Sequence, residues 1–129
     1  MSTQPLDMPL SQLPGYSEVA GIVAGRPLFH FGRVASFFFR RQEDMLGDVW
    51  PDIDLVMQES EPPHRKIGFR FHRAAEVEFS GFGNIPGLFF QSIKERGWEH
   101  LRFEVGDYEE SRIHLFCHEI SVYDPERVA

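Results

Sequence analysis

The middle of the chain contains a stretch in which apolar and polar residues alternate with a period of two. Between positions 66 and 73 every second residue is a large apolar one, and the residues between them are mostly basic or histidine. A β-strand directs successive side chains to opposite faces of a sheet. The pattern therefore predicts a half-buried strand, with Ile67, Phe69 and Phe71 inward and Lys66, Arg70 and His72 outward.

The same period appears in the stretches on either side, over residues 52–60 and 75–80. The outward side chains of 66–73 are mainly basic and those of 75–80 are acidic. We therefore expect these two consecutive strands to pair, with their charges facing each other. The expected inward residues are Ile53, Leu55, Met57, Val77 and Phe79, and the expected outward residues are Asp52, Asp54, Gln58, Glu76 and Glu78.

The remaining strands are predicted from shorter patterns. Residues 33–41 would fill both faces of a strand, with Ala35, Phe37 and Phe39 on one face and Val34 and Phe38 on the other. Residues 88–97 fit a strand or a short helix, and we favour the strand. Further strands are predicted over 100–105, 112–118 and 119–124, and loops over 43–52 (ended by Pro51), 61–65, 81–87 and 106–111.

One short helix is predicted near the N-terminus, over residues 17–25. Ser17 is a suitable N-cap, and Gly25 would close the helix. Val19, Ile22 and Val23 have the spacing of a single apolar face.

Together these elements predict a mainly β (α+β) fold. We expect an antiparallel β-sandwich or curled sheet of about seven or eight strands, with one short N-terminal helix. The single β-rich domain would cover residues 15–125, between a flexible N-terminal arm over 1–14 and a C-terminal tail over 126–129.

Composition narrows the class of protein. The chain has 129 residues, 13 of them phenylalanine, and a net charge of -7, which argues against nucleic acid as a partner and permits a basic protein partner. No apolar run is long enough to cross a membrane, and the N-terminus does not have the pattern of a secretory signal. The single cysteine, Cys117, is expected to be a buried thiol in a cytoplasmic protein.

Candidate chemistry is sparse. His114 and His118 would share one face of a strand but lie roughly 13 Å apart, too far for both to bind one metal ion, and Cys117 would point the other way. His30, His64, His72 and His100 have no acidic residue at a spacing that would orient them as bases. Trp50 and Trp98 are expected to be packing residues. We therefore predict no enzyme activity, no metal and no cofactor.

Two acidic clusters are the candidate partner-binding sites. The first contains Asp44, Asp48, Asp52 and Asp54, and is expected to form a solvated face or an acidic docking patch. The second is a turn in which a tyrosine stands among acidic residues, a frequent arrangement at interfaces: Asp107, Tyr108, Glu109 and Glu110.

Three stretches, LPGYSEVAGIVAGRPLFHFGRV, IGFRFHRAAEVEFSGFG and RIHLFCHEISV, resemble an immunity-protein family of bacterial polymorphic toxin systems, the family numbered fifty. The resemblance runs from about Leu13 to Val122. His30 matches the family's histidine, but Phe31 and Arg33 stand where acidic residues are expected, so no polar site is carried over.

The resemblance implies a cytoplasmic protein that binds a cognate toxin domain and occludes its active site without catalysis. Two alternatives follow from the residues themselves. A small-molecule-binding β domain would use phenylalanines to line a cavity. A self-associating structural domain would form a homodimer through edge strands.

Overall fold

The computed structural model describes residues 9–24, 31–43, 45–80, 87–93, 101–107 and 112–126. The described chain forms eight strands, one α-helix and one turn of 3-10 helix. In chain order these are η1 (Leu10–Gln12), α1 (Tyr16–Val23), β1 (Arg33–Glu43), β2 (Val49–Gln58), β3 (Lys66–His72), β4 (Ala75–Phe79), β5 (Leu88–Ser92), β6 (Phe103–Asp107), β7 (Ile113–Cys117) and β8 (Glu119–Tyr123).

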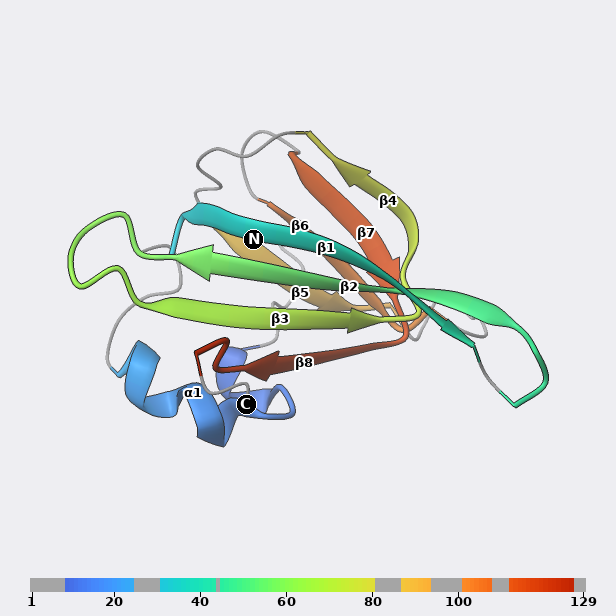
Figure 1. The fold of residues 1–129 in the computed structure, drawn as a ribbon, viewed down its shortest axis with the longest axis horizontal. Helices are drawn as coiled ribbons and strands as arrows, with labels where there is room; N and C mark the ends of the chain where they lie inside the picture. The colour runs from blue at the N-terminus through green and yellow to red at the C-terminus, as the bar shows by residue number, and fades with distance from the viewer. Residues whose placement is uncertain are drawn as a thin grey trace, which may run out of the picture.

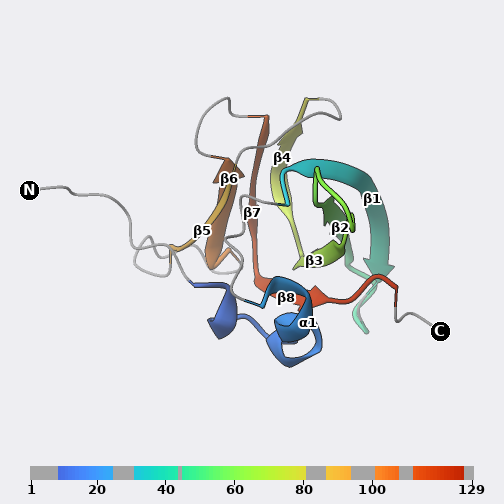
Figure 2. The ribbon, with the colours of Figure 1, turned by 90° about the vertical axis from the view of Figure 1, so that its left-hand side faces the viewer.

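The strands form two antiparallel sheets that pack face to face (Figures 1 and 2). One sheet has the order β1-β2-β3-β8 and the other the order β4-β7-β6-β5. The chain passes between the sheets at His118, whose backbone N–H donates to the carbonyl of His72 at 2.8 Å. The mainly β fold predicted from the sequence is confirmed, and neither sheet closes on itself.

The core lies between the two sheets and follows the period-two pattern. Every residue predicted to point inward on β2 and β3 is buried. From the second sheet, Phe90 packs on Phe69, with ring centroids 5.4 Å apart. The buried face of the second sheet also contains Val105, Ile113, Leu115 and Cys117. Cys117 is thus the buried thiol that the sequence predicted.

The helix α1 packs along β8 at the lower side of the sandwich (Figure 2). Val19 and Val23 are buried and Ile22 packs against the core, as the spacing predicted. The N-cap, however, is Gly15 rather than Ser17, and its φ of 88° is in the left-handed region. A side chain at Gly15 would collide with the carbonyl oxygen of Val122, so this glycine permits the close approach of helix and strand.

Residues 9–14 are more tightly packed than a flexible arm over 1–14 implies. Leu13 is buried, and Leu10 packs against the core. The carbonyl of Pro14 accepts a hydrogen bond from the N–H of Val122 at 2.9 Å. The residues before position 9 lie outside the described chain, as do 127–129 of the expected tail. None of the helices in the described ranges has the length and apolar character needed to span a bilayer.

The β1–β2 hairpin differs most from the sequence prediction. The loop expected over 43–52 is confined to the residues between Glu43 and Val49, and Pro51 lies inside β2. The Pro51 carbonyl accepts from the N–H of Ala74 at 2.8 Å. In an antiparallel strand, the N–H and the carbonyl of one residue point to the same side. The nitrogen of Pro51 therefore faces the same side as its carbonyl, away from β1 and beyond the end of β3. The N–H that proline lacks thus removes no hydrogen bond to β1.

β1 does not have two filled faces. Phe37 stacks on Phe79 of β4 with ring centroids 4.0 Å apart, whereas Phe38 and Phe39 are 60% and 55% exposed. β1 is an edge strand, so one side of it has no neighbouring strand among the described residues. The predicted placing of Val34 and Phe37 on opposite faces is wrong, because both pack against the core and a bulge between Val34 and Ser36 interrupts the alternation.

The predicted pairing of 66–73 with 75–80 is wrong. β3 pairs with β2 and β8, and β4 belongs to the other sheet, next to β7. Val77 and Phe79 do turn toward the core and Glu76 and Glu78 toward solvent, as predicted. Residues 88–92 form a strand as expected, and residues 81–86 of the loop predicted over 81–87 lie outside the described residues.

Candidate functional site

The outer face of the first sheet carries a set of charged side chains in register. Opposite Asp54 of the central strand β2 lie Phe38 on β1 and Arg70 on β3, and Arg70 is opposite Ser121 on β8. In the next row, Arg40 lies opposite Asp52, and His72 opposite Glu119. The acidic side chains of β2 are therefore flanked by basic side chains on both neighbouring strands.

Asp54 bridges two arginines. The Nε of Arg70 donates to its Oδ1 at 2.7 Å, and the Nη2 of Arg40 lies 3.0 Å from its Oδ2. The hydrogen bond to Asp54 raises the pKa of the Arg70 guanidinium above its ordinary value. Arg70 also lies over the ring of Tyr123, 5.0 Å from its centroid. Burial and the Asp54 carboxylate raise the pKa of Tyr123. Asp54 is thus a buried side chain whose charge is compensated by two arginines.

Asp52 joins a second network beside the first. Its Oδ1 accepts from the backbone N–H of Arg73 at 3.0 Å, and its Oδ2 lies 3.4 Å from Nδ1 of His72. The other ring nitrogen of His72 is 3.3 Å from the hydroxyl of Ser121. The order carboxylate, imidazole, hydroxyl is that of a nucleophile triad. Both contacts are longer than the roughly 2.6–3.2 Å at which a base activates a nucleophile.

An open hollow of about 420 Å³ adjoins this network, where the hairpin leaves the sheet. Asp52 and His72 contribute to its wall, whereas Ser121 does not. Arg73 lies over the ring of Trp50, 4.9 Å from its centroid, so the aromatic face already holds an internal guanidinium. The other lining residues are Gln42, Glu43, His118 and Glu119.

The hairpin continues past the hollow and projects from the molecule (Figure 1). The pairs Gln42↔Trp50 and Glu43↔Val49 lie beyond Ile53↔Phe71, where the β2–β3 register begins. We call the described residues 43 and 45–49 the hairpin tip. Its side chains are exposed and include three large apolar ones: Met45 at 101%, Leu46 at 87% and Val49 at 49%. Exposed apolar groups on a projecting element are typical of a protein-interaction site.

The structure divides the first predicted acidic cluster. Asp48 is exposed in the hairpin tip, and Asp44 lies outside the described residues. Asp52 and Asp54 point away from the core as predicted, but they are 7% and 6% exposed and ion-paired, so a solvated role is wrong for them. The alternation of apolar and polar residues predicted correctly which face of β2 Asp52 and Asp54 occupy. Their burial could not be predicted in this way, because it depends on side chains from the neighbouring strands.

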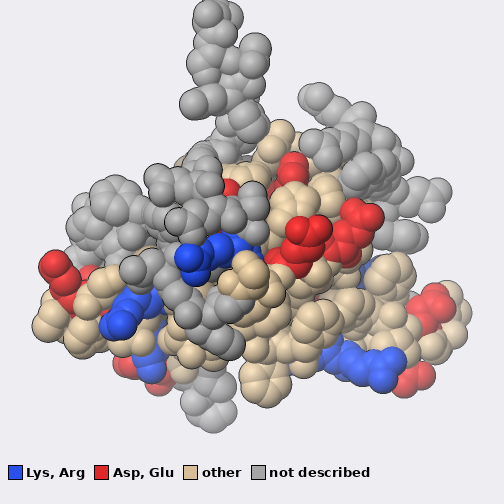
Figure 3. Space-filling view, turned by 90° about the horizontal axis from the view of Figure 1, so that it is seen from above, with Lys and Arg blue, Asp and Glu red and all other residues tan. Residues whose placement is uncertain are grey.

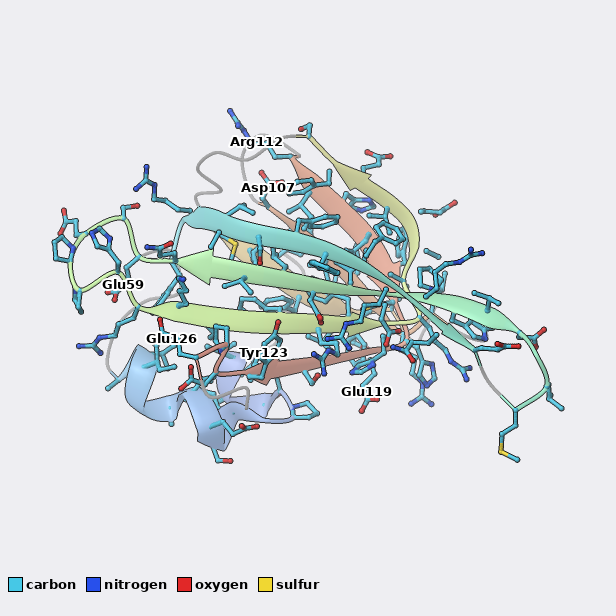
Figure 4. The ribbon with its side chains drawn as sticks, in the orientation of Figure 1. Glu59, Asp107, Arg112, Glu119, Tyr123 and Glu126 are labelled. Carbon is cyan, nitrogen blue, oxygen red and sulfur yellow. The ribbon has the colours of Figure 1, made fainter. Side chains whose placement is uncertain are left out.

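Of the second predicted cluster the structure describes Asp107, which lies at the end of β6 and far from the hairpin tip (Figures 1 and 4). Asp107, expected in a solvated turn, is only 7% exposed and accepts the N–H of Ile113 at 3.0 Å. It therefore closes the connection between β6 and β7. Tyr108, Glu109 and Glu110 lie outside the described residues.

The histidines are the groups that sequence reasoning placed least well. His72 has a carboxylate neighbour, Asp52, that is 20 positions away in the chain but on the next strand. His114, on the outer face of the second sheet, lies 2.6 Å from Glu104 Oε2. Both partners come from antiparallel neighbours, so no local spacing could have indicated them. His64 is exposed in the β2–β3 loop, and His30 and His100 lie outside the described residues.

Among the described residues, no group of three or more histidine, cysteine or acidic side chains is arranged to hold a metal ion. The structure therefore offers two features for function: the polar outer face with its hollow, and the apolar hairpin tip.

Comparisons with models of known protein families, with curated proteins and with solved structures find no match to this chain.

Proposed function

We propose that this protein neutralises a cognate bacterial toxin domain by binding it and covering its active site, without catalysis. The proposal joins the family resemblance to one structural observation: the exposed Met45 and Leu46 at the end of a projecting hairpin. Such side chains gain from burial against a partner, at about 25 cal/mol per Å² of apolar surface removed from water. A projecting hairpin can also enter a concave surface, and enzyme active sites are concave.

The charges around the hairpin tip favour a basic partner. Glu43 and Asp48 are exposed at the tip, and Glu119 is exposed at the edge of the adjoining hollow. With a net charge of -7, the protein would attract a basic toxin such as a nuclease. We do not retain Asp52 and Asp54 at the contact, because Arg40, Arg70 and His72 already occupy their carboxylates.

The test is toxin neutralisation in cells. The C-terminal domain of the large secreted protein expected from the adjacent gene is expressed with and without this protein, and growth is measured. We expect the wild-type chain to restore growth. The variant M45D/L46D should fail to do so while keeping the wild-type circular dichroism spectrum and melting temperature.

The matched control is Ser60→Asp. Ser60 is also exposed in a loop between two strands, at the opposite end of β2. S60D adds charge without touching the hairpin tip and should protect as well as the wild type. Equal protection by M45D/L46D would remove the hairpin tip from the proposal, and no protection by the wild type would remove that toxin as the partner. Because the exposed acidic side chains Glu43, Asp48 and Glu119 are proposed to attract the partner, the affinity of the complex should also fall as the salt concentration rises.

A hydrolytic function is the second candidate, and the Asp52–His72–Ser121 order favours it. In that case the Ser121 oxygen would attack an ester carbonyl while His72 takes the hydroxyl proton. His72 would then protonate the leaving alcohol, and water would release the acyl group. Hydrolysis of p-nitrophenyl acetate that disappears in both Ser121→Ala and His72→Gln would support this function. Wild-type turnover no faster than that of S121A would dismiss it.

A further inference from the structure

The edge of β1 carries a short segment whose polar and aromatic positions are symmetric about its central residue. Residues 36–40 read Ser-Phe-Phe-Phe-Arg, with a polar residue at each end and three aromatic residues between. β1 is the outermost strand of its sheet, and within the described residues it pairs only with β2. Phe38 and Phe39 are exposed on this strand, on opposite faces of the sheet.

We propose that two copies of this chain associate by antiparallel pairing of their β1 strands, about a twofold axis at Phe38. An unpaired edge presents a row of backbone N–H and C=O groups that can bond to another strand. Two identical strands that pair antiparallel are related by a twofold axis whatever their sequence, so a second β1 can occupy the edge. A second β1 is the favoured occupant because it can place the aromatic residues of this edge opposite one another.

The register follows from the side chains. Centring on Phe38 places Phe38 opposite its own copy, Phe37 opposite Phe39 of the other copy, and Ser36 opposite Arg40. Aromatic pairs directly opposite each other stabilise a sheet, and like charges in that position destabilise it. A register centred on Arg40 would oppose two arginines. The bulge between Val34 and Ser36 confines regular pairing to Ser36 and the residues after it.

The pairing would join two four-stranded sheets into one continuous sheet. The hairpin tips of the two copies would then point in opposite directions, since the strands are antiparallel. The view from above, the side on which β1 and β4 lie in Figure 1, shows basic and acidic groups distributed among uncharged surface (Figure 3). The inference does not depend on the proposed function, because the hairpin tip lies outside the pairing segment.

Sedimentation equilibrium tests whether the association occurs. For the wild type, the average mass should rise from one chain toward two as concentration increases. Phe38→Asp places two like charges at the axis and should remain monomeric throughout. Val49→Asp is the matched control, since Val49 is also a half-exposed apolar residue of the hairpin, and it should dimerise as the wild type does. A wild type that stays monomeric, or an F38D variant that dimerises normally, overturns the proposal.

Cysteine cross-linking tests the register. The native Cys117 is buried and does not interfere. Phe38→Cys should form a covalent dimer under mild oxidation, because only residue 38 faces its own copy. Ser36→Cys alone and Arg40→Cys alone should not, since like positions would be roughly 13 Å apart. A mixture of the two single variants should cross-link to each other. Cross-linking of S36C to itself as readily as F38C would refute the register.

Discussion

Removing the charge of Asp54 should destabilise the protein more than a surface ion pair would lead one to expect. Asp54→Asn keeps the shape of the side chain but removes the charge that Arg70 and Arg40 share. The Arg70 hydrogen bond is short, at 2.7 Å, and the Asp54 side chain is buried. Charge-assisted hydrogen bonds of this kind contribute about 1.5–3 kcal/mol. Arg40 is 44% exposed, so its pair with Asp54 should add less than about 1 kcal/mol.

We therefore expect Asp54→Asn to lower the free energy of unfolding by about 2–4 kcal/mol. In a domain of this size, that corresponds to a fall in melting temperature of about 8–15 °C. The assay is urea unfolding of a double-mutant cycle. Coupling of Asp54 with Arg70, measured through Arg70→Met, should reach about 1–2 kcal/mol and exceed the coupling with Arg40, measured through Arg40→Met. A cost for D54N below about 0.5 kcal/mol, or stronger coupling to Arg40, would refute this reasoning.

Three further outcomes are expected, each measured by equilibrium unfolding. Burial raises the pKa of Cys117, so the folded chain keeps the thiol proton that the unfolded chain releases above about pH 8.5. The free energy of unfolding should therefore fall by up to about 1.4 kcal/mol for each pH unit above that value. The variant Cys117→Ala should be less stable at pH 7, but its free energy of unfolding should lack this slope between pH 8 and 9.5. A methyl group at Gly68 would overlap the Tyr123 ring, so Gly68→Ala should cost about 1–3 kcal/mol, and less in a Tyr123→Ala background. Asp107→Ala should cost about 1–3 kcal/mol because it leaves the N–H of Ile113 without its carboxylate acceptor, whereas Asp107→Asn, which retains an oxygen, should cost less.

The parts of the fold that the sequence predicted correctly are those decided by local chain geometry. Alternation placed Phe69 inward and Arg70 outward on the same strand because successive side chains in any extended chain point to opposite faces. The helix face containing Val19 and Val23 was found for the same reason. In each case the prediction required only the residue's own backbone conformation, and no knowledge of which segment lay beside it.

The parts that failed depend on which strands become neighbours. Charge complementarity between consecutive segments suggested that β3 pairs with β4, but Arg70 faces Asp54 on the preceding strand instead. Glu78 lies opposite His114 in the other sheet. Acidic residues stand on both sides of β3 in sequence, so charge alone could not distinguish the two pairings. The loop composition around Pro51 was misleading because proline is tolerated where a strand extends past its neighbour.

The distribution of charge also limits where a partner can be bound electrostatically. On the outer face of the first sheet, Arg40 and Arg70 both pair with Asp54, and Asp52 lies on the same face, so the two positive and two negative charges cancel at a distance. The excess negative charge that gives the chain its -7 must therefore act from exposed side chains such as Glu43. Reversing that charge with Glu43→Lys should slow association with a basic partner more than Asp54→Asn does, although D54N is the variant that destabilises the fold. Steering and stability would then be assigned to different carboxylates of the same hairpin.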